Sequence, residues 1–150
     1  MIVSEDLDMA YLAGFFDGEG HVGIYERSDK QNGGSFRLEV GVTQCDPRPL
    51  YRFQEYFGGA VRLARPQKGT VKDLHVWRLS TLDEKEKFLS AMDQWCRVKS
   101  SQVGLALEFI GVLRSKDRKS RSLEPCEVRI RRKYADEIKR LKRVVWRKPG

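Results

Sequence analysis

Two acidic residues, Asp17 and Glu19, stand among glycines in the segment YLAGFFDGEGHVGIY, which covers residues 11–25. The apolar residues before them predict a short helix from about Asp8 to Phe16. Both acids would then follow the C-terminal end of that helix, where the aligned peptide dipoles leave partial negative charge. Carboxylates in this position favour a cationic partner, so the pair is the first candidate for chemistry in the chain.

The same helix carries a narrow stripe of small residues, because positions i, i+3, i+4 and i+7 share one helix face. The stripe consists of Ala10, Ala13, Gly14 and Asp17, and large apolar side chains form a different stripe. Glycine inside a helix costs about 1 kcal/mol relative to alanine, and close contact with a second helix would compensate for Gly14. The stripe indicates a helix–helix interface, although an ordinary amphipathic helix with an incidental glycine also fits it.

The segment LAGFFDGEG, residues 12–20, resembles the LAGLIDADG motif of homing endonucleases. It matches at the leucine, the alanine, both flanking glycines and the first acid, and Glu19 keeps a carboxylate at the second acid. The resemblance covers about residues 8–113 and implies an α+β domain with the family's αββαββα order. Only one copy of the motif is present, which in that family implies a homodimer whose motif helices pack side by side through the small stripe.

The resemblance also implies a metal-dependent nuclease that hydrolyses both strands of a long, near-palindromic DNA duplex. Glu19 is expected to bind Mg²⁺, with the Gly18 carbonyl as a further ligand and with Mn²⁺ able to substitute. Hard cations of this kind prefer oxygen ligands, typically one or two carboxylates together with phosphate and water. Asp17 is expected mainly to hold the helix end at the dimer seam, and less as a metal ligand.

Further polar residues are expected to act on the DNA. In the family that the motif resembles, such residues order the attacking water or offset charge on the scissile phosphate, and the resemblance implies these roles for Gln44, Arg48 and Lys99. Base reading is expected from the polar face of a β-sheet, because the major groove admits a two-stranded ribbon. The residues expected on that face are His21, Tyr25, Arg27, Asp29, Lys30, Ser35, Arg37, Glu39, Arg62, Lys68, Lys72 and Arg78. An ordinary solvated surface is the alternative for each of these residues.

The expected elements follow from hydrophobic periodicity. Residues 21–28 and 35–44 alternate apolar and polar and predict a hairpin, and residues 60–67 and 74–81 predict a second hairpin. Helices are expected within 46–59, over 82–96 and 100–113, and in the basic segment from residue 127 onward. Four antiparallel strands with helices packed on one face would form an α+β domain whose other sheet face is polar and partly basic.

Charge and cysteine content limit the partners and the compartment. The 150 residues include 29 basic and 21 acidic side chains, a net charge of +8, which favours a polyanionic partner. Nucleic acid is favoured over an anionic membrane surface, because no basic amphipathic segment with a long apolar face stands out. The longest apolar run, residues 103–113, is also too short to span a bilayer. Three widely spaced cysteines fit neither a disulfide framework nor a zinc site and indicate a reducing, intracellular compartment. The sequence does not distinguish an organellar, bacterial or archaeal origin. The basic C-terminal segment is either a DNA phosphate contact or a solvated face.

Two other functions fit the sequence. A non-cleaving relative would act as a maturase on intron RNA or as a DNA-binding regulator and would need no metal, although the retained Glu19 argues against it. A generic nucleic-acid-binding module, explained by charge alone, would show no sequence preference and a steep salt dependence. Double-stranded DNA and a second copy of the chain are the partners that the motif favours.

Overall fold

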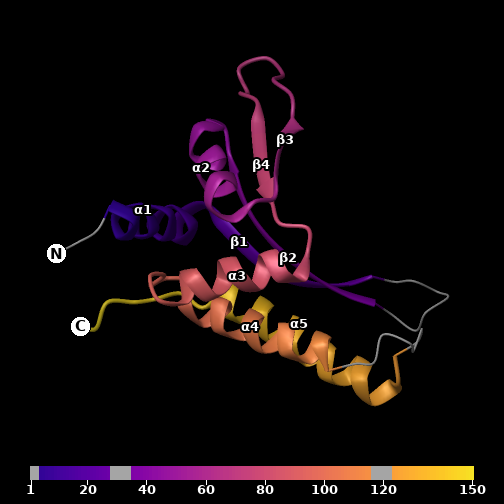
Figure 1. The fold of residues 1–150 in the computed structure, drawn as a ribbon. Helices are drawn as coiled ribbons and strands as arrows, with labels where there is room; N and C mark the ends of the chain where they lie inside the picture. The colour runs from indigo at the N-terminus through magenta and orange to yellow at the C-terminus, as the bar shows by residue number, and fades with distance from the viewer. Residues whose placement is uncertain (1–3, 28–34, 116–122) are drawn as a thin grey trace.

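A computed structural model describes residues 4–27, 35–115 and 123–150 of the chain, with five helices and four strands in the described part (Figure 1). In chain order these are α1 (Ser4–Glu19), β1 (Gly20–Arg27), β2 (Ser35–Gln44), α2 (Arg48–Phe57), β3 (Ala60–Arg65), β4 (Leu74–Arg78), α3 (Leu82–Asp93), α4 (Ser100–Arg114) and α5 (Pro125–Arg143). The predicted α+β class is confirmed, and the αββαββα order is confirmed for residues 4–93, with α4 and α5 following. None of the described helices is both long enough and apolar enough to cross a bilayer.

The four strands form one antiparallel sheet in the order β1-β2-β4-β3, so the two predicted hairpins lie side by side. Gly41 of β2 pairs with His21 of β1 on one side and with Arg78 of β4 on the other, and Arg78 pairs with Ala60. Residues that are paired across a sheet face the same side of it. His21 and Arg78 therefore lie in one row across the sheet, with Gly41 between them.

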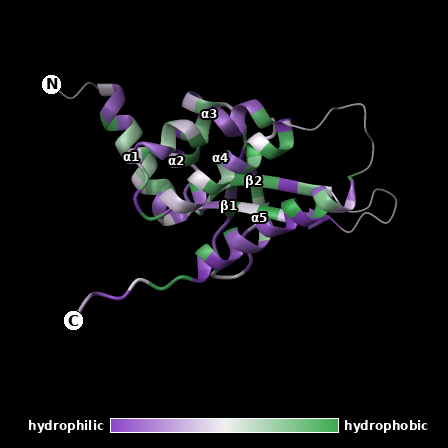
Figure 2. Ribbon diagram, turned by 90° about the horizontal axis from the view of Figure 1, so that it is seen from below, coloured by the Kyte–Doolittle hydropathy of each residue, from purple (hydrophilic) through white to green (hydrophobic). Residues whose placement is uncertain are grey.

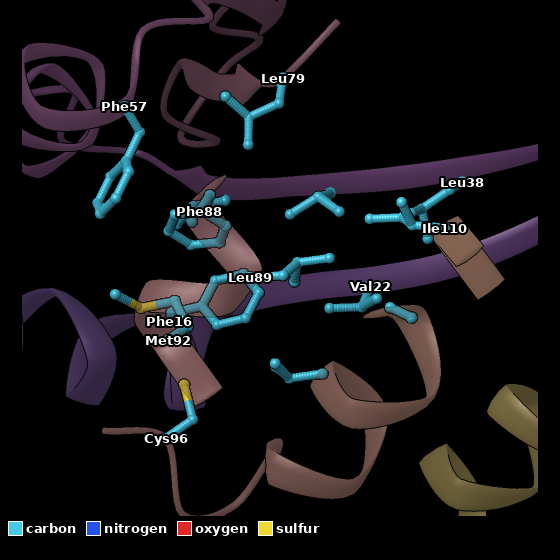
Figure 3. Close-up of a cluster of buried hydrophobic side chains, with 14 of the residues drawn as sticks. Phe16, Val22, Leu38, Phe57, Leu79, Phe88, Leu89, Met92, Cys96 and Ile110 are labelled. Atoms are coloured by element: carbon cyan, nitrogen blue, oxygen red, sulfur yellow. The ribbon is translucent and has the colours of Figure 1, made fainter. Parts of the chain in front are cut away.

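The apolar face of the sheet is covered by helices through a cluster of aromatic rings. The Trp77 ring stacks on Phe53 with centroids 4.9 Å apart, and Phe88 contacts Trp77 edge-on at 5.1 Å and Phe16 at 5.0 Å. All four rings are fully buried. Figure 3 shows Phe16 and Phe88 close to Leu89 and Met92 inside this core. Since these rings come from α1, α2, α3 and β4, they fix the motif helix against the sheet.

The strand patterns agree with the predicted alternation. Strand β2 begins and ends at the predicted residues, and Leu38, Val40 and Val42 are buried on the core side. In β4 the core residue is Trp77, with Leu79 just beyond the strand also buried in the core, and Arg78 on the opposite face is exposed. The second hairpin therefore points its basic residues to the polar face of the sheet.

Helix ends differ from the predicted ones. Helix α1 continues to Glu19 rather than ending near Phe16, so both acids lie in its last turn. Helix α3 ends at Asp93, before Cys96, and α5 begins at Pro125, where Glu124 and Glu127 form a capping box. These differences arise from hydrogen bonds at the helix ends, which periodicity does not report.

Helix α5 packs along α4 and the edge strand β1, and its surface is largely hydrophilic (Figure 2). Ala135 and Ile138 bury their side chains in the core, and the Tyr134 ring lies 5.7 Å from that of Phe109 in α4. The Arg132 guanidinium donates two hydrogen bonds to the Glu26 carboxylate of β1, at 2.7 and 3.2 Å. The basic C-terminal segment is therefore part of the domain up to the end of α5.

Candidate functional site

The C-terminal end of α1 is joined to the N-terminal end of α4 through the Asp17 carboxylate. Asp17 Oδ2 accepts a hydrogen bond from the backbone N–H of Arg97 at 2.8 Å, and Oδ1 accepts one from the N–H of Lys99 at 2.9 Å. These amides immediately precede α4, where unpaired N–H groups carry partial positive charge. The negative charge of Asp17 is unfavourable at the C-terminal end of its own helix, and the N–H groups before α4 compensate for it.

The pKa of Asp17 reflects two opposing effects. Burial raises the pKa, but the backbone N–H groups of Arg97, Lys99 and Val98 together outweigh burial and leave the pKa below its ordinary value. The carboxylate is therefore ionised at neutral pH and committed to backbone amides. Asp17 thus joins the end of α1 to the start of α4.

Lys99 supplies the cation that the end of α1 lacks. Its Nζ donates a hydrogen bond of 2.5 Å to the backbone carbonyl of Asp17, in the last turn of α1. Burial lowers the pKa of Lys99, and the charges of Asp17, Cys96 and Glu19 act in the opposite direction. The predicted residue Lys99 is thus held at the motif end by both its backbone and its side chain.

Cys96 does not add a metal-binding group to this end of the molecule. Its side chain is buried beside the backbone carbonyl of Ala13, with Sγ 3.8 Å from that oxygen. Burial, followed by the charge of Asp17, raises the pKa of the thiol to about 12. Cys96 therefore stays a protonated thiol and packs as a small apolar residue.

Glu19, the last residue of α1, is exposed and differs in this from Asp17. No hydrogen bond or ion pair engages its carboxylate within residues 4–27, 35–115 and 123–150. Gly20 next to it is required by packing, because a Cβ there would lie 2.1 Å from the Phe16 ring and 2.6 Å from the Phe16 carbonyl oxygen. The glycine lets the chain turn tightly from helix into strand and leaves Glu19 at the corner.

Gln44 lies at the same end of the sheet. Gly20 pairs with Val42, so Gln44 follows two residues beyond the start of β1, at the level of the α1–β1 corner. Its Oε1 accepts a hydrogen bond of 2.7 Å from the N–H of Cys45. This geometry places Gln44 near the motif but turns its carbonyl oxygen to its own backbone.

Arg48 begins α2 a few residues later and is held by Asp46. Its Nε lies 3.0 Å from both carboxylate oxygens of Asp46, and its Nη2 lies 2.5 Å from Oδ2. Hydrogen bonds from the Arg48 side chain and backbone lower the pKa of Asp46 to about 2. The Arg48 side chain is nevertheless 87% exposed, so the ion pair is in contact with solvent.

The polar face of the sheet contains a shallow cavity of about 340 Å³. Its charged lining residues are Arg37, Glu39, Arg62, Arg78 and Lys85, four cations and one carboxylate. Arg37 and Glu39 form a close ion pair, and Lys85 from α3 lies near both, with a pKa that is lowered first by burial and then by Arg37. The lining of the cavity is therefore basic overall, and Glu39 is the one carboxylate among the described residues that line it.

The remaining residues predicted for this face have different positions. His21 lies in the row with Arg78, and burial, then Arg78, lowers its pKa. Tyr25, Arg27 and Ser35 lie at the far end of the first hairpin, and Lys68 and Lys72 are exposed between β3 and β4. Asp29 and Lys30 lie outside the described residues.

The chain is similar to known proteins in structure but matches none of them in sequence. No protein-family model and no curated protein sequence matches the chain. Solved structures do match. The archaeal intron-encoded homing endonuclease I-Vdi141I, complexed with DNA, gives a TM-score of 0.78 at 19% identity, over 98% of this chain and 91% of that chain.

Two further structures extend this likeness. The homing endonuclease I-CvuI, in complex with a DNA target in the presence of Mg, gives a TM-score of 0.75 at 21% identity, over 96% of this chain and 87% of that chain. The LAGLIDADG meganuclease I-AabMI, bound to uncleaved DNA, gives a TM-score of 0.63 at 24% identity, over 84% of this chain and 44% of that chain. The chain has the LAGLIDADG homing endonuclease fold.

In this LAGLIDADG fold the predicted small stripe of α1 divides between two environments. Ala10 and Gly14 are exposed, whereas Ala13 is only 1% exposed and Asp17 turns toward α4. The open face of α1 carries Leu7, Ala10, Tyr11, Gly14 and Gly18, which follow helical spacing. A Cβ at Gly14 or Gly18 would meet nothing within this chain, so neither glycine is needed for packing inside the subunit.

Sequence reasoning missed three charged residues that lie next to predicted ones: Asp46 beside Arg48, Lys85 in the cavity of the polar face, and Lys142 beside Tyr25. Asp46 precedes a proline and an arginine at a helix start, and that local signal for an ion pair was available. Lys85 and Lys142 reach the polar face from helices, and their placement depends on how α3 and α5 pack. Periodicity assigns both residues only to solvated helix surfaces.

Proposed function

We propose that this protein is a homing endonuclease that binds a long, near-palindromic DNA duplex as a homodimer and hydrolyses both strands with a divalent metal ion. The observation that carries the proposal is the exposed Glu19 carboxylate at the corner of α1 and β1, beside Lys99 and next to a basic sheet face. Structural neighbours described as homing endonucleases in complex with DNA support it.

The homodimer is inferred from the open face of α1. Leu7 and Tyr11 expose 58% and 53% of their surfaces beside Gly14, and exposed apolar residues on a helix favour burial against a partner. Small residues allow two helices to approach closely. A single chain aligns with only 44% of I-AabMI, which supports the need for a second copy.

The donor set fits a hard cation only when two copies combine. No group of three or more His, Cys, Asp or Glu side chains that could hold a metal occurs within the described residues. Two Glu19 carboxylates, one from each copy, together with DNA phosphate and water would match the oxygen ligands that Mg²⁺ prefers, and Mn²⁺ would use the same set. Gly18 is exposed next to Glu19, and its carbonyl oxygen is a further donor. When bound, the metal would polarise the phosphoryl group and activate water.

The residues of this chain would act around that metal in distinct ways. Lys99 would stabilise charge that develops on the scissile phosphate, and the Asp17 carboxylate would hold Lys99 and the end of α1 together. Gln44, at the same corner, would turn from its backbone partner to order water. Arg37, Arg62 and Arg78 would bind guanine edges or phosphates, and Glu39 would accept from cytosine.

A cleavage selection tests the proposal directly. The protein is incubated with a library of randomised palindromic duplexes in Mg²⁺, and in parallel with the same library in Ca²⁺ under conditions that report binding. We expect one consensus that is cut in Mg²⁺ and bound in Ca²⁺. A consensus that is bound but never cut would replace the nuclease by a DNA-binding regulator, and no enrichment at all would direct the search to structured intron RNA.

The oligomeric state is a separate test. Sedimentation at several protein concentrations should give the mass of two chains, and a duplex that carries both half-sites should bind far more tightly than one half-site. The half-sites of the selected consensus should be symmetric, because a twofold dimer reads both in the same way. A monomer that binds an asymmetric site would contradict the homodimer.

The ion pair of Arg48 with Asp46 leads to a prediction about affinity for DNA. Asp46→Asn removes the carboxylate that binds the Arg48 guanidinium, so Arg48 becomes available to phosphate. We expect the affinity for duplex in Ca²⁺ to rise by roughly two- to fivefold at low salt, with the gain lost at high salt because the pair is exposed. A matched control is Asp93→Asn, which removes an exposed charge at the end of α3. An equal gain in both variants would assign the effect to net charge alone.

A further inference from the structure

The end of α5 returns to the α1–β1 corner and brings a second lysine there. Helix α5 runs back along α4, so that its last turn lies near the start of α4 (Figure 1). A cavity of about 410 Å³ lies between these elements, and its lining includes Gly20, His21, Lys99, Gln102 and Lys142. Two lysines, Lys99 just before α4 and Lys142 in the last turn of α5, thus line the same cavity as the residues that follow Glu19.

The ammonium group of Lys142 lies over the aromatic ring of Tyr25 in the edge strand β1. Its Nζ lies 5.9 Å from the centroid of the Tyr25 ring, within the range of a cation–π interaction. The ring itself folds back over Gly23, since a Cβ at Gly23 would lie 2.5 Å from Tyr25 Cε2. The glycine therefore leaves room for the ring, and the ring supports the lysine above the strand.

A second contact fixes the direction of α5. Arg132, almost three helical turns before Lys142, binds the Glu26 carboxylate with two hydrogen bonds. Glu26 follows Tyr25 in β1, and Gly20 and His21 at the other end of the strand line the cavity with Lys142. Helix α5 is therefore held along β1 at two levels, and its C-terminal end cannot slide away from the corner without breaking both contacts.

The charges in the cavity are unbalanced. Burial and then the charge of Lys99 lower the pKa of Lys142, and Glu39 acts in the opposite direction. Lys99 has its Asp17 carbonyl contact, whereas Lys142 has only the ring and no ion pair among the described residues. Two ammonium groups that repel one another across a solvent-accessible cavity favour an anion between them.

We propose that Lys142 and Lys99 form a phosphate-binding pocket beside Glu19, in which Lys142 is positioned by the Tyr25 ring over Gly23. The inference rests on the proposed function for its ligand, a phosphate of the DNA backbone near the scissile bond. Lys142 would hold this phosphate from the side opposite to Lys99. The Tyr25 ring would act as a positioning residue for Lys142 in addition to any contact that it makes with a base.

The first experiment uses inorganic phosphate and does not require a nuclease. Amide NMR resonances of Gly20, His21 and Gln102 are followed as phosphate is added at constant ionic strength without divalent metal. We expect them to shift in the wild-type protein, with an affinity that falls about three- to tenfold in Lys142→Gln and is retained in Lys142→Arg. Lys133→Gln is the matched control, because Lys133 lies on the same helix but lines the groove with α4.

The second experiment uses the duplex from the cleavage selection. Lys142→Gln should reduce the slope of log affinity against log salt by about 0.9, the value for one lost phosphate contact, and Lys133→Gln should not. Tyr25→Leu should reproduce the effect of Lys142→Gln if the ring positions the lysine. Salt slopes and phosphate affinities that are the same in Lys142→Gln and Lys133→Gln would overturn the pocket.

The two experiments distinguish this proposal from the proposed function. Phosphate binding that depends on Lys142 in a protein that cuts no duplex would retain the pocket and remove the nuclease. A duplex that is cut normally by Lys142→Gln, with no phosphate response at Gly20, His21 and Gln102, would retain the nuclease and overturn the pocket.

Discussion

Glu19→Gln should bind the selected duplex in Ca²⁺ within about twofold of the wild-type affinity, yet cut it in Mg²⁺ at least about a thousand-fold more slowly, a change of roughly 4 kcal/mol in activation free energy. The amide has the shape of the carboxylate but lacks its charge, and a hard cation prefers charged oxygen ligands. Because Glu19 is exposed and makes no hydrogen bond in the described structure, its replacement leaves the fold intact.

Single-turnover cleavage and equilibrium binding measure these two effects separately. Glu108→Gln is the matched control, since Glu108 is an exposed carboxylate in α4, well away from the end of α1. The control should cut at the wild-type rate. A Glu19→Gln protein that retains cleavage within about tenfold of the wild-type rate would remove Glu19 from the metal site and with it the main support for the proposed mechanism.

The strands of this protein were predictable because one face of the sheet is buried. A one-residue shift of register would turn Leu38, Val40 and Val42 to solvent, so the alternation in residues 35–44 determines both the strand and its inward face. The same reasoning predicted Arg78 on the polar face, and in the structure Arg78 is exposed there while the adjacent Trp77 is buried in the core. Local pattern is sufficient where burial enforces a period of two.

The ends of the helices and the details of the site were not predictable in this way. Helix α1 runs to Glu19, and the Asp17 carboxylate in its last turn accepts hydrogen bonds from backbone amides 80 and 82 residues later. No local sequence pattern indicates such distant partners. The place of Lys142 depends on the packing of α5 along β1, through Arg132 and Glu26. The motif identifies both acids in the sequence. Only the tertiary contacts show that the Asp17 carboxylate is hydrogen-bonded to backbone amides, whereas the Glu19 carboxylate makes no hydrogen bond in the described part of the chain.

Asp17→Asn should lower the free energy of unfolding by about 1–3 kcal/mol, the usual cost of losing hydrogen bonds to a charged acceptor. Asparagine offers one carbonyl oxygen, and its NH₂ group would face a backbone N–H of Arg97 or Lys99 with no acceptor between them. Urea denaturation at one fixed protein concentration measures the change, because subunit association would also contribute to stability. Asp93→Asn, an exposed charge at the end of α3, should change stability by less than about 0.5 kcal/mol.

The loss should extend to cleavage, because Asp17 also fixes the position of Lys99. In Asp17→Asn the start of α4 is no longer held to the end of α1, so the Lys99 ammonium loses the geometry in which it reaches the phosphate. We expect a cleavage rate at least about tenfold below wild type at saturating duplex, with smaller effects on binding. Equal rates would mean that the single bond from Lys99 Nζ to the Asp17 carbonyl is sufficient to hold the lysine.

The stability difference between wild type and Asp17→Asn should also depend on pH in a defined direction. The folded-state pKa of Asp17 lies below the ordinary value of 3.8, so the ionised carboxylate stabilises the fold fully above that value. As the pH falls below 3.8 and through the lower folded-state pKa, the wild-type carboxylate is protonated and this contribution is lost. The difference should therefore be constant between about pH 5 and 8 and shrink below about pH 4. A difference that is unchanged at low pH would assign the stabilisation to shape rather than to charge.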